Sequence, residues 1–158
     1  MRSAIGNSLL LNLVIIFVSL IVLFFVGILS YSKAYRAKNR IVELIEESET
    51  YDSNVVSEIE NNLDLMGYSI SRDDYCSKEN VQQHISNRAP EEENIVNLAS
   101  TNGYNYCVFK IDRSLIGSKG IYYVVVTFVK FEFPVIGNII NIPVYGETKI
   151  LGIDYDYE

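Results

Sequence analysis

Hydrophobic positions dominate one long stretch near the amino terminus of the chain. A short polar leader, residues 1–8, precedes residues 9–29, which are apolar except for Asn12, Ser19 and Gly27. A helix rises about 1.5 Å per residue, so a segment of this length crosses a hydrocarbon core of about 30 Å. The pattern therefore predicts a transmembrane helix over residues 9–29. A cleaved secretory signal has a shorter apolar core, so an uncleaved anchor is the better interpretation.

The pattern then changes without any sign of a break in the helix. Residues 30–49 contain no proline and no glycine, and their apolar positions recur at steps of three and four. This spacing is typical of an amphipathic helix that packs one face against a globular domain. The apolar face consists of Ala34, Ala37, Ile41, Leu44 and Ile45. We therefore expect residues 30–49 to continue the transmembrane helix.

A second, shorter helix is expected over residues 55–66. Its apolar residues have helical spacing, and Ser53 or Asn54 supplies the side chain that caps its first turn. Gly67 follows as the residue that ends the helix in a left-handed conformation.

Two further helical segments are expected in the polar middle of the chain. Residues 78–88 have room for one or two turns, with Val81 and Ile85 facing inward. Pro90, followed by three glutamates, is typical of a helix start, and Asn102-Gly103 is typical of a helix end.

From residue 104 onward the apolar residues alternate as they do in β-strands. One strand is expected at residues 106–111 and a longer one at 121–133. The first half of the longer strand is apolar on both faces, which predicts a central strand covered on both sides. Residues 139–151 give one or two more strands, and Pro143 and Gly146 within them indicate a sheet edge. The fold class is therefore α+β: a long helix followed by a small domain, residues 50–158, with short helices and an antiparallel sheet.

Charge narrows the choice of partner. The chain has 13 basic and 20 acidic residues, and only one basic residue, Arg2, precedes the apolar run. An acidic domain argues against nucleic acid as a partner, because phosphate binding requires a basic face. Basic residues cluster just beyond the apolar run, where they can meet lipid phosphates. The cluster consists of Lys33, Arg36, Lys38 and Arg40.

The basic cluster and the cysteines point to opposite sides of the membrane. The positive-inside rule places residues 33–40 in the cytoplasm. Cys76 and Cys107 are the two cysteines of the chain, and such a pair persists as a disulfide only outside the reducing cytosol. We favour the cysteine argument and expect a single-pass protein of the cell membrane whose carboxyl-terminal domain is extracytoplasmic.

Residues that carry chemistry are scarce. His84 is the single histidine, it lies in a polar stretch, and we expect it to be an exposed helix residue. No HExxH or CxxC spacing occurs, which leaves a metal site unsupported. We therefore expect no catalytic residue, no cofactor, no metal and no small-molecule substrate, and we do not expect an enzyme.

Two stretches of sequence resemble a known family. Residues 31–42, Tyr-Ser-Lys-Ala-Tyr-Arg-Ala-Lys-Asn-Arg-Ile-Val, resemble the segment after the membrane helix in TadE-like minor pilins of the tight-adherence system. Residues 124–134, Val-Val-Val-Thr-Phe-Val-Lys-Phe-Glu-Phe-Pro, resemble the closing β-region of that family. The layout of a long helix followed by an antiparallel sheet is that of type IV pilin-like proteins in general. The glutamate that follows the cleavage point in prepilins is absent here, because residues 7–11 are Asn-Ser-Leu-Leu-Leu.

The resemblance implies a structural role. The implied partners are other pilin-like subunits, a membrane assembly platform with its ATPase, and membrane lipid. Small or apolar residues would let the helix pack closely against its neighbours; these are Gly27, Ala34, Ala37 and Ile41. Gly6 is the candidate residue before a leader cleavage point. The alternative from another class is a monomeric single-pass membrane protein whose extracytoplasmic domain binds a ligand or a polymer.

Overall fold

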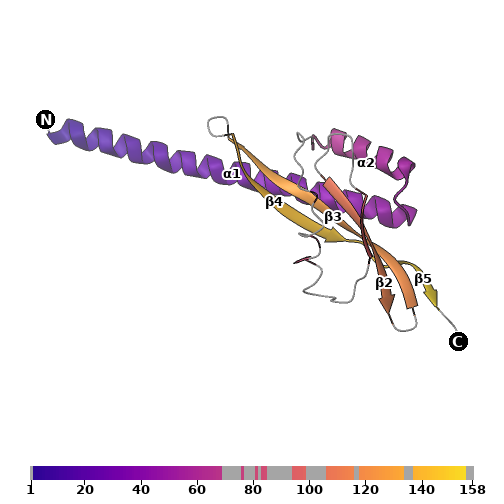
Figure 1. Cartoon of the computed structure of the whole chain (residues 1–158). Coiled ribbons are helices and arrows are strands. Elements are labelled where there is room, and N and C mark those ends of the chain that lie inside the picture. The colour runs from indigo at the N-terminus through magenta and orange to yellow at the C-terminus, as the bar shows by residue number, and fades with distance from the viewer. Residues whose placement is uncertain are drawn as a thin grey trace.

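The chain folds into one long helix and a small antiparallel sheet packed against the carboxyl-terminal half of that helix (Figure 1). This arrangement confirms the predicted α+β class. The structure, a computed structural model of the whole chain, describes residues 2–68, 76, 81, 83–84, 94–98, 106–115, 118–133 and 137–155.

The first helix, α1 (Arg2–Ser48), joins the apolar and amphipathic segments without interruption. Its backbone is already helical at Arg2, earlier than residue 9, where the hydropathy pattern places the start. It ends one residue before Glu49, whose φ of 52° lies in the left-handed region. A residue in that conformation cannot continue a right-handed helix, so the rod stops there.

The second helix, α2 (Ser53–Leu65), packs beside the end of α1. The sequence misplaces its amino-terminal cap, because Asp52, and not Ser53 or Asn54, accepts hydrogen bonds from the first free amides of the helix. Its carboxyl end is as expected, since Gly67 has a φ of 62°. The amide of Tyr68 bonds back to the carbonyl of Leu63, which completes the usual glycine-ended helix terminus.

The sheet has five antiparallel strands in the order β1-β2-β3-β4, and β5 also pairs with β3. The strands are β1 (Asn94–Asn97), β2 (Tyr106–Leu115), β3 (Ser118–Phe133), β4 (Gly137–Glu147) and β5 (Leu151–Tyr155). Strand β3 pairs with β2 along one side, so β4 and β5 share its other side. The predicted strands at 106–111 and 121–133 are confirmed and are longer than expected.

The helix expected to start at Pro90 is wrong for the residues that the structure describes. Residues 94–97 form β1, in which Ile95 lies opposite Ile111 of β2. A local helix-start signal gives way here to pairing with a strand that is distant in sequence, and the β-branched pair Ile95-Val96 suits a strand. Pro90 itself and Ile85 lie outside the described residues, whereas Val81 has helical backbone and is buried as expected.

Apolar residues cover both faces of β3, as the sequence predicts for a central strand. Tyr123, Val125 and Val129 pack with α1 and α2 in one core cluster. The intervening residues pack on the opposite face with Val81 and strand β2. Helix α1 therefore lies on a sheet whose central strand is buried from both sides.

Strand β4 lies at the edge of the sheet, as Pro143 predicts. Tyr123 of β3 exchanges hydrogen bonds with Thr148, just past the end of β4. Successive residues of a strand direct their backbone groups to opposite sides, so Phe128 directs its groups toward β2. Pro143 is opposite Phe128, and its missing N–H therefore falls on the outer side of β4, where no strand pairs with it among the described residues.

Candidate functional site

The most unusual surface of the molecule is the amino-terminal half of α1. Every side chain from residue 8 to residue 25 is exposed, and this stretch projects beyond the domain (Figure 1). Leu9 is 67% exposed and Phe24 is 68% exposed. A helix that is apolar on all sides is typical of a membrane span or of a buried helix, so this half is a candidate for contact with lipid or other apolar helices. It is the helix of the described chain that is long and apolar enough to cross a membrane.

A polar residue inside this half is satisfied without water. The hydroxyl of Ser19 donates to the carbonyl of Ile15 one turn earlier, at 2.8 Å. Polar groups in hydrocarbon must find their partners within the protein, and a serine bonded to its own helix meets that requirement.

The other half of α1 is fixed to the domain through small buried residues. Ala34, Ala37 and Ile41 are completely or almost completely buried in the core cluster that α1 shares with the sheet. The two alanines allow the backbone of the helix to lie close to β3. Thr127 of β3, also fully buried, donates its hydroxyl proton to the carbonyl of Ala34 at 3.0 Å. These predicted helix-packing residues thus lie within the chain's own domain, and Gly27, the fourth, is half-buried in α1.

The aliphatic part of the Lys38 side chain packs strand β4 against α1. The side chain of Lys38 passes over Gly146, where a Cβ atom would lie 2.7 Å from Lys38 Cδ. Its ammonium group lies 4.2 Å from the centre of the Tyr35 ring, a cation–π contact. Glycine at position 146 therefore leaves room for Lys38 to cross the edge strand. Further along α1, Glu46 accepts a hydrogen bond from the amide of Lys149, which follows β4.

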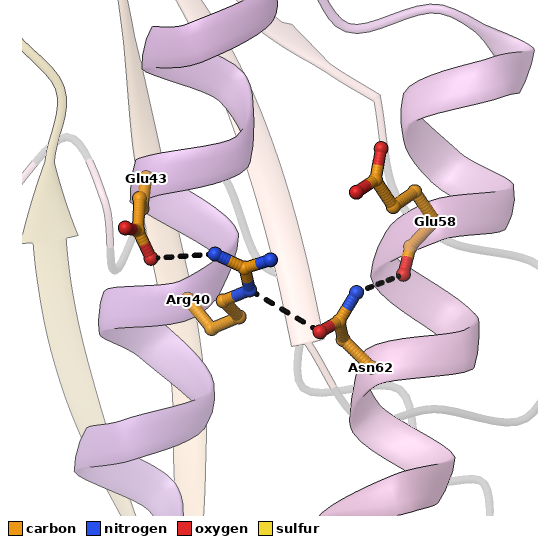
Figure 2. Close-up of polar contacts among 4 residues, drawn as sticks. All are labelled: Arg40, Glu43, Glu58 and Asn62. Carbon is orange, nitrogen blue, oxygen red and sulfur yellow. Dashed lines mark hydrogen bonds and ion pairs between the residues drawn. The ribbon is translucent and has the colours of Figure 1, made fainter.

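Polar side chains join α1 to α2 (Figure 2). Arg40 contacts Glu43 at 2.8 Å and donates from Nε to the amide oxygen of Asn62 at 3.2 Å. Asn62 in turn donates to the carbonyl of Glu58 in α2 at 2.8 Å. The hydrogen bond to Glu43 raises the pKa of Arg40 above its already high value, so this residue stays charged. Because these groups are partly solvated, the ion pair contributes at most about 1 kcal/mol and acts mainly to fix the angle between the helices.

Tyrosine hydroxyls fill the polar positions of the core. The hydroxyls of Tyr51 and Tyr106 lie 3.4 Å apart. Burial, with a smaller effect of Tyr106, raises the pKa of Tyr51 well above its usual value. Burial also raises the pKa of Tyr68 to about 12, although hydrogen bonds from Phe128 and Thr127 oppose this. At physiological pH these groups are therefore neutral, hydrogen-bonding members of the core.

The two cysteines lie where the sequence predicts a pair. Cys76 and Cys107 are at disulfide-bonding distance, with Cα atoms 5.6 Å apart. Cys107 belongs to β2, and the carbonyl of Cys76 also accepts a hydrogen bond from Asn97 of β1 at 3.4 Å. The bridge thus ties the segment that contains Cys76 to the face of the sheet opposite α1.

His84 is not the freely exposed residue that the sequence predicts. Its ring stacks on Tyr145 of β4, with centroids 4.1 Å apart, and is half-buried. Its Nε2 lies 3.5 Å from a carboxylate oxygen of Glu147. His84 and Tyr145 lie about sixty residues apart in sequence, so no local sequence pattern predicts their contact. The contact holds His84 against the edge strand β4.

Metal chemistry finds no support in the described part of the chain, where no three His, Cys, Asp or Glu side chains gather. The expectations of no enzyme and no cofactor stay predictions. Gly6 lies within the helical backbone of α1, and its role as a cleavage point also stays a prediction.

Comparisons with protein-family models, with curated proteins and with solved structures find no match to this chain. The resemblance to TadE-like minor pilins therefore rests on the sequence layout alone. What the described residues provide is a helix whose exposed apolar half is attached rigidly to a small disulfide-linked domain.

Proposed function

We propose that the chain is a membrane-anchored minor pilin or pseudopilin-like structural subunit of a Tad or type IV pilus, or of a related secretion apparatus. The observation that carries this proposal is the continuity of α1. One helix is exposed and apolar over its first half and forms part of the domain core over its second half.

This architecture suits a subunit that assembles through its helix. In lipid, helices associate by close packing and not by the hydrophobic effect, so a small residue such as Gly27 favours contact with a neighbouring helix. The bond between Thr127 and Ala34 and the Arg40 bridge hold the domain to the same rod. A displacement of the anchor is then transmitted to the domain without a hinge.

In this proposal the domain is extracytoplasmic and the partners are other pilin-like subunits, a membrane assembly platform and lipid. The paired cysteines support an extracytoplasmic domain, because a disulfide persists outside the reducing cytosol. The basic residues that argue for the opposite side are partly engaged within the domain, since Arg40 contacts Glu43 and Lys38 contacts Tyr35.

A photo-cross-linking scan of the exposed half of α1 tests the assembly role. Single photoreactive residues placed in turn at residues 12–25 of the full chain, with the native cysteine pair intact, are irradiated in membranes of the native host. We expect cross-links to other single-pass subunits that recur every three or four positions, as one helix face would give. Absence of cross-links at every position would overturn the assembly role and favour the alternative, a monomeric single-pass protein with a ligand-binding domain.

A matched pair of variants tests the packing itself. Gly27→Leu adds bulk to the helix surface, whereas Gly27→Ala adds one methyl group. We expect the leucine variant to lose co-purification with its partner subunits and the alanine variant to keep most of it. Equal co-purification of both would show that close packing at this position is not required.

A further inference from the structure

The structure divides the basic cluster beyond the apolar run into two pairs. Lys38 and Arg40 are half-buried and engaged within the domain, since the ammonium group of Lys38 lies over a tyrosine ring and Arg40 forms an ion pair. Lys33 and Arg36 are exposed, and no hydrogen bond or ion pair joins either of them to a residue that the structure describes. Two cations of the cluster are therefore available to an outside partner.

The two available cations have no acidic neighbour on their own helix. The first acidic residue of the chain is Glu43, seven residues beyond Arg36. The exposed Asp64, in the last turn of α2, forms no ion pair with Lys33. Lys33 and Arg36 are three residues apart, so their positive charges are neighbours on one side of α1. An anionic partner reduces the repulsion between them as well as attracting each.

Both residues lie at the level expected for lipid headgroups. At 1.5 Å per residue, Lys33 lies about 6 Å and Arg36 about 10 Å beyond Leu29, the last residue of the apolar run. The headgroup layer is about 5–7 Å thick on each side of the hydrocarbon. Side chains of a helix point toward its amino terminus, which here is the half expected in the membrane. The long side chains of Lys33 and Arg36 therefore extend back into the headgroup layer.

Two tyrosines lie at the same level on α1. Tyr31 and Tyr35 are both exposed, and their rings stack with centroids 6.2 Å apart. Tyrosine is enriched where a membrane span meets water, because the ring suits the lipid boundary while the hydroxyl stays hydrated. These rings support placing the membrane surface at residues 31–36.

The carboxyl end of α2 reaches this level too. Arg40 bonds to Asn62, and the Lys33 ammonium group lies 4.0 Å from the position that a Cβ atom on Gly67 would occupy. Helix α2 therefore runs back toward the membrane alongside α1. Leu65, near this end, is 87% exposed, which suits a residue that contacts the lipid boundary.

We propose that Lys33 and Arg36 bind the phosphate groups of anionic phospholipids in the leaflet next to the domain. The bound headgroups fix how far the domain stands from the bilayer. This inference rests on the membrane anchor of the proposed function but not on assembly with other subunits.

Lipid is the occupant because depth and charge both select it. Phosphate groups lie at the level of Lys33 and Arg36 wherever residues 9–29 cross the hydrocarbon. A second copy of the chain in the same orientation lies at the same depth, so on this side of α1 it presents its own Lys33 and Arg36. Like charges repel, whereas the anionic surface of a bilayer attracts basic residues next to a span.

A single tryptophan tests the proposal, because the chain has none of its own. Leu29→Trp places it on the same side of α1, four residues before Lys33 and seven before Arg36. The full chain is reconstituted at low density in vesicles of phosphatidylcholine and phosphatidylglycerol in equal amounts. Bromine is placed on the acyl chains of one lipid or of the other, and the ratio of the two quenching values measures which lipid lies beside the tryptophan. Near-ultraviolet circular dichroism checks that the domain is folded.

Two double variants of this reporter chain remove the same charge. Lys33→Gln/Arg36→Gln removes the exposed pair, and Lys38→Gln/Arg40→Gln removes the engaged pair. We expect phosphatidylglycerol to be enriched beside the tryptophan by about fivefold, the ratio that one basic residue near an anionic surface gives. The first variant should lose this enrichment and the second should keep most of it.

Equal quenching by the two brominated lipids in the reporter chain overturns the proposal. In that case, a carbodiimide cross-link from Lys33 to a second copy would indicate an acidic protein surface as the partner. Equal loss of enrichment in both double variants would contradict the assignment to Lys33 and Arg36. Absence of quenching by either lipid would contradict the membrane anchor itself, so failure of the anchor is distinguishable from failure of the headgroup site.

Discussion

The hydroxyl of Thr127 donates to the carbonyl of Ala34 at 3.0 Å, and both residues are completely buried. This contact joins the central strand of the sheet to the long helix near the point where α1 leaves the exposed apolar segment. Because the Ala34 carbonyl is already within a helix, the threonine adds a second bond without disturbing the helix. The contact fixes the level at which the domain is attached to α1.

Thr127→Val tests this contact, since valine has nearly the same shape without the hydroxyl. We expect the free energy of unfolding to fall by about 1–2 kcal/mol, the range for one buried hydrogen bond and its desolvated partner. Denaturant unfolding of the full chain in detergent, followed by near-ultraviolet circular dichroism, measures it. Thr50→Val, at an exposed position, is the control. A stability equal to that of the control would show that the bond contributes nothing.

Ala34→Leu tests how closely α1 lies against β3. Adding bulk where Ala34 is fully buried forces the helix away from the strand, and we expect a loss of about 1–3 kcal/mol from overpacking. Asn39→Leu adds a leucine on the exposed face of the same helix and should change stability little. The comparison uses thermal unfolding in detergent. If both variants melt together, Ala34 has more space than the structure indicates.

The parts of the fold that follow from short-range periodicity could be predicted from the sequence. The length of α1, its buried face from Ala34 to Ile45 and the two-sided burial of β3 all depend on spacings of two to four residues. The cysteine pair was predictable because the chain offers a single combination. The edge position of β4 followed from Pro143, which cannot donate to a neighbouring strand.

Contacts between residues far apart in sequence were not predictable in the same way. Strand β1 exists because Ile95 pairs with Ile111 of β2, and this partner is invisible to a local pattern. The stacking of His84 on Tyr145 has the same character. Asp52 was missed as the cap of α2 because Ser53 and Asn54 are equally good capping residues, and only the course of the backbone selects among them.

Removing the cysteine pair should destabilise the domain. In Cys76→Ala/Cys107→Ala, the loop between two residues 31 apart is no longer closed in the unfolded chain. The chain-entropy argument gives a loss of about 3–4 kcal/mol. The same loss should follow when the unaltered chain is unfolded in the presence of a reductant, whereas the double variant should be indifferent to reductant. An unaltered chain whose unfolding does not depend on reductant would contradict the contribution of the pair.

The cysteines also report the side of the membrane. We expect a membrane-impermeant thiol reagent to label intact cells only after treatment with a reductant, which frees the partly buried Cys76 from its pair. Labelling that instead requires lysis of the cells, with no need for a reductant, would place the domain in the cytoplasm and contradict the extracytoplasmic assignment.

Tyr68 supplies hydrogen bonds to a part of β3 that lies past the end of β2. The last pair between these strands is Tyr106 with Thr127, and Phe128 is the next residue. The hydroxyl of Tyr68 accepts from the Phe128 amide at 2.9 Å and donates to its carbonyl at 3.2 Å. The Tyr68 side chain thus takes the position of a neighbouring strand beside Phe128. Its hydroxyl proton is required for one of the two hydrogen bonds, the one to the Phe128 carbonyl.

Stability should therefore fall at alkaline pH in a way that depends on Tyr68. Its pKa is about 12 in the folded chain, against about 10 for an ordinary tyrosine. The unfolded chain loses this proton first, so the contribution is complete below pH 10 and is lost as the pH rises toward 12, by up to about 2–3 kcal/mol. Tyr68→Phe should be less stable than the unaltered chain at pH 8, because the hydrogen bonds between the Tyr68 hydroxyl and Phe128 are lost, and this difference should shrink steadily above pH 10. Val55→Ala, a core truncation without a titrating group, should keep a constant difference across the same range. Parallel profiles for Tyr68→Phe and the unaltered chain would show that the Tyr68 hydroxyl does not control the alkaline transition.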